Sequence, residues 1–389
     1  MTLVQDRPHS HGAGPTGSPA ERFTSRNPDD FSVPRGREED WRFTPVREIR
    51  DFFEPFAEPT PFERESSAPE PASIELVDRD HPGVGRVLQP GDRVSALSFA
   101  SARRAVLVKI PEHAALTEPI RVTINGTGAT AYGHLVIDAG RFSAATVIVT
   151  YTGSGRSAGN VEISASDGAQ LTVVHLEDGG SDFVHLQAHA VSVGRDASVK
   201  HVMIGLGGSL VRITPTVQFE GPGGSVELLG ASFAGDGQHF ESRLFIDHSQ
   251  PNCTSNVLYK NALLGESART VWVGDVRIRP DATGTNTYEM NRNLLLSDGA
   301  RADSVPNLEI ETGNIAGAGH ASATGRFDDL QLFYLQSRGI PEETARRLVV
   351  RGFFADVVNR IGIAELERQI MAAIETRLGY TPDTDSEIE

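Results

Sequence analysis

The sequence predicts a mainly β protein, with a right-handed parallel β-helix as its core and helical regions at both ends. Between about residues 105 and 326, short segments alternate apolar and polar residues, as strands with one buried face do. Gly, Asp and Asn separate these segments, and no amphipathic helix intervenes. The turns at Asp167-Gly168, Asp196-Ala197 and Gly223-Gly224 lie about 28 residues apart, and later turns recur every 16 to 18 residues.

Regular strands and turns without helices are compatible with a sandwich, a propeller or a solenoid. The solenoid is favoured because Asn-Gly and Asp-Gly pairs, the usual hairpin signals, are few and the turns recur near coil length. Each coil of a β-helix buries its inward residues against the coils above and below it. A sandwich remains the alternative that the pattern allows.

The chain divides into four predicted regions. Residues 31–104 contain the segment Gly36–Phe56, which places aromatic and aliphatic residues at helical intervals, and a Pro- and Glu-rich linker from Glu58 to Pro71. The regions are a disordered tail at 1–30, a helical or mixed region at 31–104, the β-helix at 105–326, and a helical region with an acidic tail at 327–389.

Three short helices are predicted after Arg326. Asp328 and Asp329 suit the first turn of one helix, Pro341 opens the next, and the third runs from Ala364 to Leu378. We expect these helices to cap one end of the β stack and to offer their outer faces to a partner. The predicted buried stripe of the second helix is Ala345, Leu348, Val349, Phe353, Val357 and Ile361.

Composition excludes several classes of function. A formal net charge of −16 argues against binding to nucleic acid or to an anionic membrane. No segment approaches the ~18–20 apolar residues of a membrane span, and the N-terminus lacks the pattern of a secretory signal, so we expect a cytoplasmic protein. The chain has no P-loop and no nucleophile elbow. Any ATP-derived energy must therefore come from another protein.

Cys253 is the only cysteine, so the chain cannot form an internal disulfide. Nor can it hold an iron–sulfur cluster alone, because clusters typically need about four strong ligands, most of them thiolates. A partner would have to supply the rest. We expect Cys253 to be a buried, inert thiol, since nothing near it in sequence would lower its pKa into the reactive range.

Five histidines deserve separate interpretation. His175, His185, His189 and His201 lie in alternating segments, where a metal site is one interpretation and structural histidines the favoured one. His320 differs, because the Gly and Ala residues around it would let a cluster or another backbone approach closely. Glu309 and Glu311, in the preceding β segment, could add carboxylates. The alternative is an incidental histidine in a tight turn.

Three segments together resemble the SufD subunits of the SufB/SufD family, which belong to the SUF machinery for iron–sulfur cluster assembly. They are GREEDWRFTPV (Gly36–Val46), DHSQPNCTSNVLYKNAL (Asp247–Leu263) and the long block from Asn291 to Ile340 that contains GHASATGRFDDLQLFYLQSRGI.

The resemblance implies a non-enzymatic scaffold built on a parallel β-helix. Such a subunit pairs with a SufB-like subunit through the β-helix, and its C-terminal helices, here 327–378, hold a SufC-like ATPase. A transient cluster shared with SufB would form at the interface, with His320 as an iron or cluster ligand, and this chain alone would bind no cofactor stably. ATP hydrolysis by SufC would expose His320 for cluster building.

Two features bear on which subunit this is. SufB-like chains carry a cysteine near the segment that reads NRNLLLS here; its absence favours SufD. Many SufD-like chains have a cysteine two residues before the histidine, where this chain has Ala318. The alternatives are a carbohydrate-active β-helix enzyme and a SufB-like homodimeric scaffold. A homodimer of the isolated chain is also compatible with the sequence.

Overall fold

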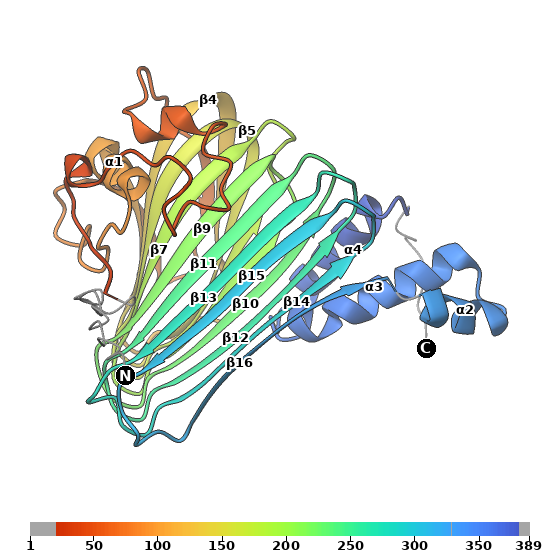
Figure 1. Cartoon of the computed structure of the whole chain (residues 1–389). Helices are drawn as coiled ribbons and strands as arrows, with labels where there is room; N and C mark the ends of the chain where they lie inside the picture. The colour runs from red at the N-terminus through yellow and green to blue at the C-terminus, as the bar shows by residue number, and fades with distance from the viewer. Residues whose placement is uncertain (1–20, 328, 381–389) are drawn as a thin grey trace, which may run out of the picture.

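The computed structural model describes residues 21–327 and 329–380, and its strands form a parallel β-helix (Figure 1). Pairing is parallel at every junction from β3 to β16, which confirms the predicted β-helix and rules out the antiparallel sandwich. The strands are β3 (Arg104–Ile110), β4 (Ile120–Ala139), β5 (Ala144–Ala165), β6 (Gln170–Glu177), β7 (Val184–Val193), β8 (Ser198–Gly205), β9 (Leu210–Phe219), β10 (Ser225–Ala234), β11 (His239–His248), β12 (Thr254–Leu263), β13 (Arg269–Ile278), β14 (Asn286–Leu295), β15 (Arg301–Ile310) and β16 (Gly317–Arg326).

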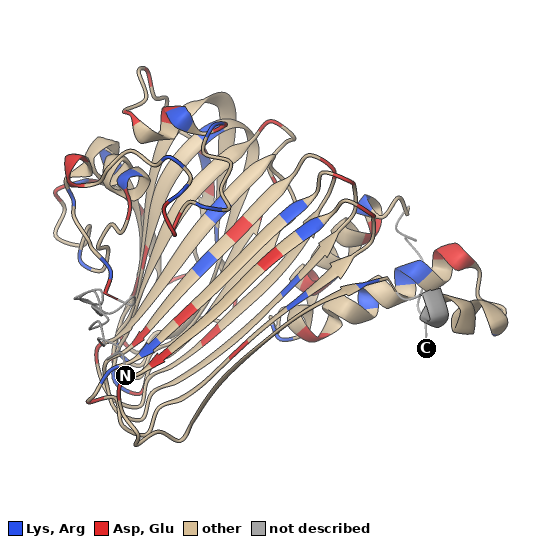
Figure 2. Cartoon of the chain, in the orientation of Figure 1, with Lys and Arg blue, Asp and Glu red and all other residues tan. Residues whose placement is uncertain are grey.

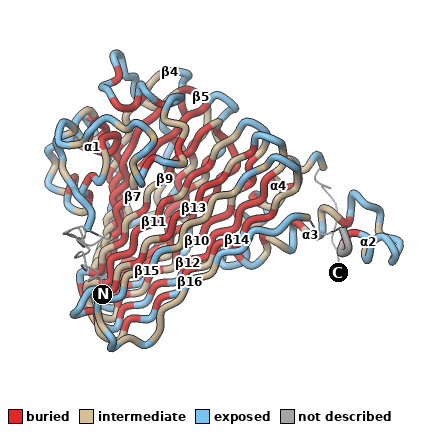
Figure 3. The backbone as a smooth tube through the Cα atoms, in the orientation of Figure 1, coloured by how far each residue is buried: buried red, intermediate tan, exposed pale blue. Residues whose placement is uncertain are grey.

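Each coil consists of two strands that belong to two facing sheets. The first sheet runs through β5, β7, β9, β11, β13 and β15, and the second through β5, β6, β8, β10, β12, β14 and β16. The long strand β5 belongs to both, because its first part pairs with β6 and its second part with β7. Side chains that alternate into the space between the sheets form one continuous apolar core. Buried residues accordingly recur along the strands through the middle of the stack (Figure 3).

The corners of the coils explain the turn spacing seen in the sequence. At one corner each coil places a residue in the left-handed region, where Gly, Asn and Asp are favoured. Its backbone N–H donates to the next coil, as Gly168 N does to Arg195 O at 2.8 Å and Asn252 N to Thr283 O at 2.8 Å. The residues that repeat this conformation are Gly168, Asp196, Gly223, Asn252 and Gly284.

The N-terminal region covers the outer face of the first sheet. Trp41, Phe52 and Phe53 are buried there against Val184, Leu186 and other outward residues of β5, β7 and β9. The remaining elements of this region are η1 (Pro28–Asp30), η2 (Arg50–Phe53), β1 (Glu63–Ser67), β2 (Ser73–Asp78) and α1 (Arg93–Ser101).

Three expectations about this region need correction. The segment Gly36–Phe56 forms turns and η2 and no regular helix. Its apolar residues still share one side, because they pack together on the surface of the first sheet. The linker Glu58–Pro71 contains β1, which pairs antiparallel with β4. Residues 1–20 of the predicted tail lie outside the described chain, whereas 21–30 contact the body of the protein, with Ser25 N donating to Pro90 O at 3.0 Å.

Two of the C-terminal helices, α3 (Glu342–Val358) and α4 (Ala364–Arg377), lie along the outer face of the second sheet and do not cap the stack as predicted (Figure 1). The helix before them, α2 (Asp329–Ser337), contacts α3. The reason is that the outer faces of β6, β8, β10 and β12 are apolar, so Val174, Val202, Leu229 and Leu258 bury against α3 and α4.

The buried stripe of α3 also differs from the prediction. Ala345 and Val357 are buried as expected, but Val350, Phe354 and Val358 complete the stripe while Leu348 is exposed. Lys260 of β12 anchors the helix, since its Nζ donates to Phe353 O at 2.7 Å and pairs with Asp356.

Ion pairs link successive coils on the outside of the first sheet, where acidic and basic residues alternate from strand to strand (Figure 2). Arg212 and Glu241 lie 3.3 Å apart, and Arg277 contacts Glu311 at 2.7 Å. The carboxylates of neighbouring coils therefore face arginines on this surface.

Candidate functional site

His320 lies on the inner face of β16, at the end of the stack. In the parallel register it pairs with Glu289 of β14, whose inner-face neighbours Thr287 and Asn291 are buried. Aligned residues of parallel strands point to the same face, so His320 points into the β-helix. It is nevertheless exposed, because no further coil covers it.

The end of the β-helix is open. Strands β15 and β16 are the last strands of their sheets, and within the described chain each pairs with only one parallel neighbour. Burial decreases accordingly, from mostly buried strands in the middle of the stack to half-buried and exposed residues in β15 and β16 (Figure 3). Such edges carry backbone N–H and C=O groups that another strand can bind.

A buried carboxyl group lies one coil beneath His320. The side chain of Glu289 is 1 % exposed, and neither of its oxygens has a hydrogen-bond partner. Burial, with the nearby charge of Asp275, raises the pKa of Glu289 to about 8. Across the interior, Gly274 gives the carboxyl room, since a Cβ there would lie 2.7 Å from Glu289 Oε1.

Other polar groups of the last coils also lack partners. The hydroxyl of Tyr259 and the indole Nε1 of Trp272 are buried on the inner face without hydrogen bonds, and their rings lie 6.5 Å apart. Burial raises the pKa of the Tyr259 hydroxyl, so this group stays protonated and neutral at physiological pH and carries no charge into the interior. Buried polar groups without partners therefore lie on β12, β13 and β14, close to the open end.

Beside these groups runs a ladder of amides that is fully satisfied. Asn293 Nδ2 donates to Asn291 Oδ1 at 2.9 Å and to Thr324 Oγ1 at 3.1 Å, while Ser304 donates to Asn291 at 2.6 Å. This ladder connects β14 with β15 and β16 and fixes the last coil. His320 therefore lies on a strand that is hydrogen-bonded to the preceding coil, and not in a turn.

Imidazole and carboxylate are ligands that suit iron. Neighbouring strands lie about 4.8 Å apart, which lets side chains at aligned positions of β14 and β16 reach a common ion. A cation would also favour the charged form of Glu289 over the neutral one. The pair can therefore supply one nitrogen and one oxygen ligand to iron at the open end.

Sequence reasoning did not identify Glu289. The available signal was the polar alternation Thr287, Glu289, Asn291, Asn293, which indicates an inward polar series, but its alignment with His320 depends on the register of the coils.

Other candidates lie elsewhere. The inner face of β15 carries every second residue, including Ser304 and Leu308, so Glu309 lies on the outer face. Glu311 pairs with Arg277. The structure does not bring these carboxylates to His320. Ala318 shares the inner face of β16 with His320 and packs against the core.

Cys253 is completely buried, and burial raises the pKa of its thiol, as expected of an inert cysteine.

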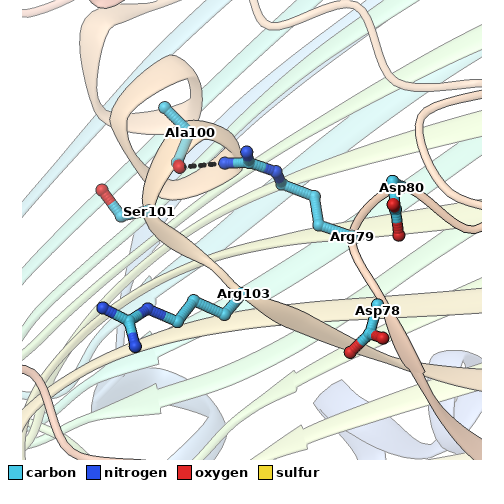
Figure 4. Close-up of a pocket in the computed structure, with 6 residues that line it drawn as sticks. All are labelled: Asp78, Arg79, Asp80, Ala100, Ser101 and Arg103. Carbon is cyan, nitrogen blue, oxygen red and sulfur yellow. Dashed lines mark hydrogen bonds between the residues drawn. The ribbon is translucent and has the colours of Figure 1, made fainter.

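A surface depression between β2, α1 and β3 is lined by Asp78, Arg79, Asp80, Ala100, Ser101 and Arg103 (Figure 4). It lies at the opposite end of the stack from His320. In it, Arg79 already donates to the carbonyl of Ala100.

Among the helices of the described chain, none has both the length and the apolarity that crossing a bilayer requires.

Fold and site together define a parallel β-helix protein with polar side chains at the open end of its stack. Residues 122–353 match the family model described as the SufBD core domain of the SUF system for iron–sulfur cluster assembly. The chain belongs to this family.

Named relatives agree with that assignment. An iron–sulfur cluster assembly SufBD family protein of Mycobacterium bovis is 50 % identical over 374 residues, which cover 94 % of each chain. The chain is 27 % identical to the iron–sulfur cluster assembly protein SufD of Bacillus subtilis, over 74 % of this chain and 67 % of the relative. It is 22 % identical to SufD of Escherichia coli, over 89 % of each chain.

Proposed function

We propose that this chain is the SufD-type, non-enzymatic subunit of a cytoplasmic SUF complex, and that His320 and Glu289 contribute ligands to an iron–sulfur cluster assembled at its open end. The observation that carries the proposal is the alignment of an exposed inward histidine with a buried, unpartnered carboxyl one coil below it. With Cys253 buried, the thiolate ligands come from the partner.

The partner at the open end is a second β-helix of the SufB type. The free edges of β15 and β16 offer unpaired backbone groups that strands of such a subunit can extend. Their inner-face residues are half-buried or exposed, and a second coil would cover them. Cluster assembly between the two chains would then take place within a shared interior that excludes water.

The C-terminal helices are the proposed docking site for the SufC-type ATPase. Phe333 and Tyr334 of α2 and Leu348 of α3 are large apolar residues that remain exposed. Helices α3 and α4 use their other side to bind the second sheet, and α2 contacts α3, so these exposed residues are available to a partner.

Anaerobic co-expression with SufB-type and SufC-type subunits of the same organism tests the proposal. We expect wild type to give a ternary complex with visible cluster absorption. His320→Ala should assemble equally well but lose at least tenfold of the cluster iron and sulfide. Ser322→Ala is the matched control, because Ser322 is the next inner-face residue on the same strand and lacks a strong iron ligand.

The outcomes separate the parts of the proposal. Normal clusters in His320→Ala would refute the role of His320 while leaving the scaffold role standing. Failure of the wild-type chain to form a complex would refute the pairing. Phe333→Ala with Tyr334→Ala should weaken SufC-type binding alone, without change in the stability of the isolated chain.

A further inference from the structure

Three of the histidines singled out in the sequence meet inside the middle of the β-helix. His175 of β6 and His201 of β8 come from the second sheet, and His189 of β7 faces them from the first. None is more than 1 % exposed. One nitrogen from each lies within 4.8 Å of the other two, an arrangement that could hold a metal ion.

The hydrogen bonds of this cluster leave several nitrogens unused. His189 Nε2 contacts Gln187 Oε1 at 2.7 Å, and His189 Nδ1 lies 2.9 Å from His201 Nε2. Neither nitrogen of His175 has a partner, and His201 Nδ1 also has none. A buried polar atom without a hydrogen bond destabilises the folded chain, so the arrangement of these three histidines is unfavourable unless something binds to it.

The surroundings keep the imidazoles neutral. Along the coils His175 aligns with Val149 and Met203, and His201 aligns with Val173 and Leu228, all of them core residues. Burial lowers the pKa of His175 and His189 far below the usual value and that of His201 to about 4. At neutral pH each ring therefore keeps a lone pair that a metal can accept.

We propose that His175, His189 and His201 form a binding site for one divalent late first-row transition metal ion within the β-helix. Three imidazole nitrogens with an open fourth position are a common ligand set for such ions, whereas Mg²⁺ and Ca²⁺ require oxygen ligands. Nitrogens around a tetrahedral ion lie about 3.3 Å apart, given Zn–N bonds of about 2.0–2.1 Å. Small rotations of the three rings bring them to that spacing.

Neighbouring residues supply the support that metal histidines usually have. Gln187 accepts the Nε2–H of His189, which leaves a lone pair on His189 Nδ1 that can bind the ion in place of its present contact with His201. The Gln187 amide in turn donates to the Tyr151 hydroxyl at 2.8 Å. Glu177, two residues beyond His175 on the same face, has one buried oxygen without a partner. Its carboxyl can offset the charge of the cation in the dry interior.

This site is separate from the proposed cluster site. Along the second sheet, three strands, β10, β12 and β14, lie between β8 and β16. His185 is not part of it, because its Nδ1 contacts Glu177 at 2.9 Å. The inference does not depend on the proposed function in cluster assembly.

The test uses Co²⁺, which takes the place of zinc and gives visible absorption bands that report its coordination. Because the site is closed, the full chain is expressed in minimal medium containing Co²⁺, so that the ion enters during folding, and is purified with EDTA. We expect one tightly held Co²⁺ per chain with bands of four-coordinate geometry. His175→Gln should retain at least tenfold less.

Two controls locate the ion. His248→Gln changes another buried inner-face histidine, whose pKa burial lowers to about 4, and it should keep the Co²⁺. His320→Ala should also keep it, which distinguishes this site from the open end. Loss of the ion in His320→Ala, or equal retention in wild type and His175→Gln, would overturn the proposal.

If His175→Gln does not fold, X-ray absorption of the wild-type cobalt protein decides the matter. Three imidazole nitrogens at about 2.0–2.1 Å support the site. A shell of oxygens alone, or a chain without cobalt after EDTA, would refute it.

Discussion

Replacing Glu289 with glutamine should stabilise the isolated chain at neutral and alkaline pH. The wild-type carboxyl is buried without a hydrogen-bond partner, and burial raises its pKa from the ordinary 4.5 to about 8. Ionisation is therefore opposed in the folded protein and unopposed in the unfolded chain. Glutamine keeps the shape of the side chain and removes the ionisation.

The pKa shift fixes the sign and the size of the effect. Because the folded pKa is raised, Glu289 favours the native state fully below about pH 4.5, and this contribution is lost as the pH rises to about 8. Each pKa unit corresponds to about 1.36 kcal/mol. The loss is therefore about 3 kcal/mol at pH 7 and about 5 kcal/mol above pH 8, as upper bounds.

Denaturant unfolding of wild type and Glu289→Gln at about pH 5, pH 7 and pH 8.5 measures this. The difference in unfolding free energy should increase steadily in favour of the variant as the pH rises. Any cost of burying the amide is independent of pH, so the slope is the decisive quantity. A difference that does not change with pH would refute the reasoning.

Glu241→Gln is the control of opposite sign. Its carboxyl is also buried, but His239, Arg212 and Thr44 stabilise the charged form and lower its pKa to about 2, against the effect of burial. This carboxylate therefore contributes stability above about pH 4.5 that is lost as the pH falls through about 2. The glutamine variant should lose stability at neutral pH, where Glu289→Gln gains it.

Two further predictions concern the rest of the fold. His201 and His248 have folded pKa values of about 4 against an ordinary 6.5, so acid unfolding should begin below about pH 6.5. Each histidine should lower the unfolding free energy by about 2 kcal/mol between pH 7 and pH 5. Denaturant unfolding at these two pH values should show a smaller loss for His248→Gln than for wild type. An unfolding free energy that does not change with pH would contradict this. Phe354→Ala should lower the unfolding free energy by about 3–5 kcal/mol, because Phe354 is fully buried between α3 and the second sheet. Phe333→Ala, 68 % exposed, should change it little, and equal effects in urea denaturation would contradict the placement of α3.

The β-helix could be predicted because its signals are local. Alternation of apolar and polar residues needs only one strand, and the left-handed corner needs only one small or amide residue such as Gly168, Asp196 or Asn252. These features repeat in the sequence at the spacing of the coils. The inert Cys253 followed from its lack of neighbours that would lower its pKa.

The alignment between coils could not be predicted in the same way. Equivalent residues of the second sheet, from Ser198 to Ser225, Thr254, Asn286 and Gly317, are separated by 27, 29, 32 and 31 residues, because the corners differ in length. The pairing of Glu289 with His320 depends on this variation. So does the meeting of His175, His189 and His201, which come from two different sheets.

The prediction that the C-terminal helices cap the stack was wrong for a related reason. A sequence reveals that a helix has an apolar face, but not which surface receives it. Here the receiving surface consists of Val174, Val202, Leu229 and Leu258, one residue from each of four strands far apart in sequence. Only after stacking do they form a continuous apolar area, and it faces sideways rather than along the axis of the β-helix.

This placement is what leaves the end of the stack open. A solenoid normally needs a polar or helical cap over its last coil, because the inner face there is otherwise exposed. Here α3 and α4 lie along the side, and the unpartnered groups of Tyr259, Trp272 and Glu289 lie on β12, β13 and β14, within two strands of the uncovered ones. A partner that covers β15 and β16 would bury their exposed inner residues. A bound iron ion would place a positive charge next to Glu289 and so stabilise its carboxylate form. Binding of that kind stabilises the folded chain by mass action. Under the proposed function, covering these groups is therefore what would favour binding of the partner subunit at the open end.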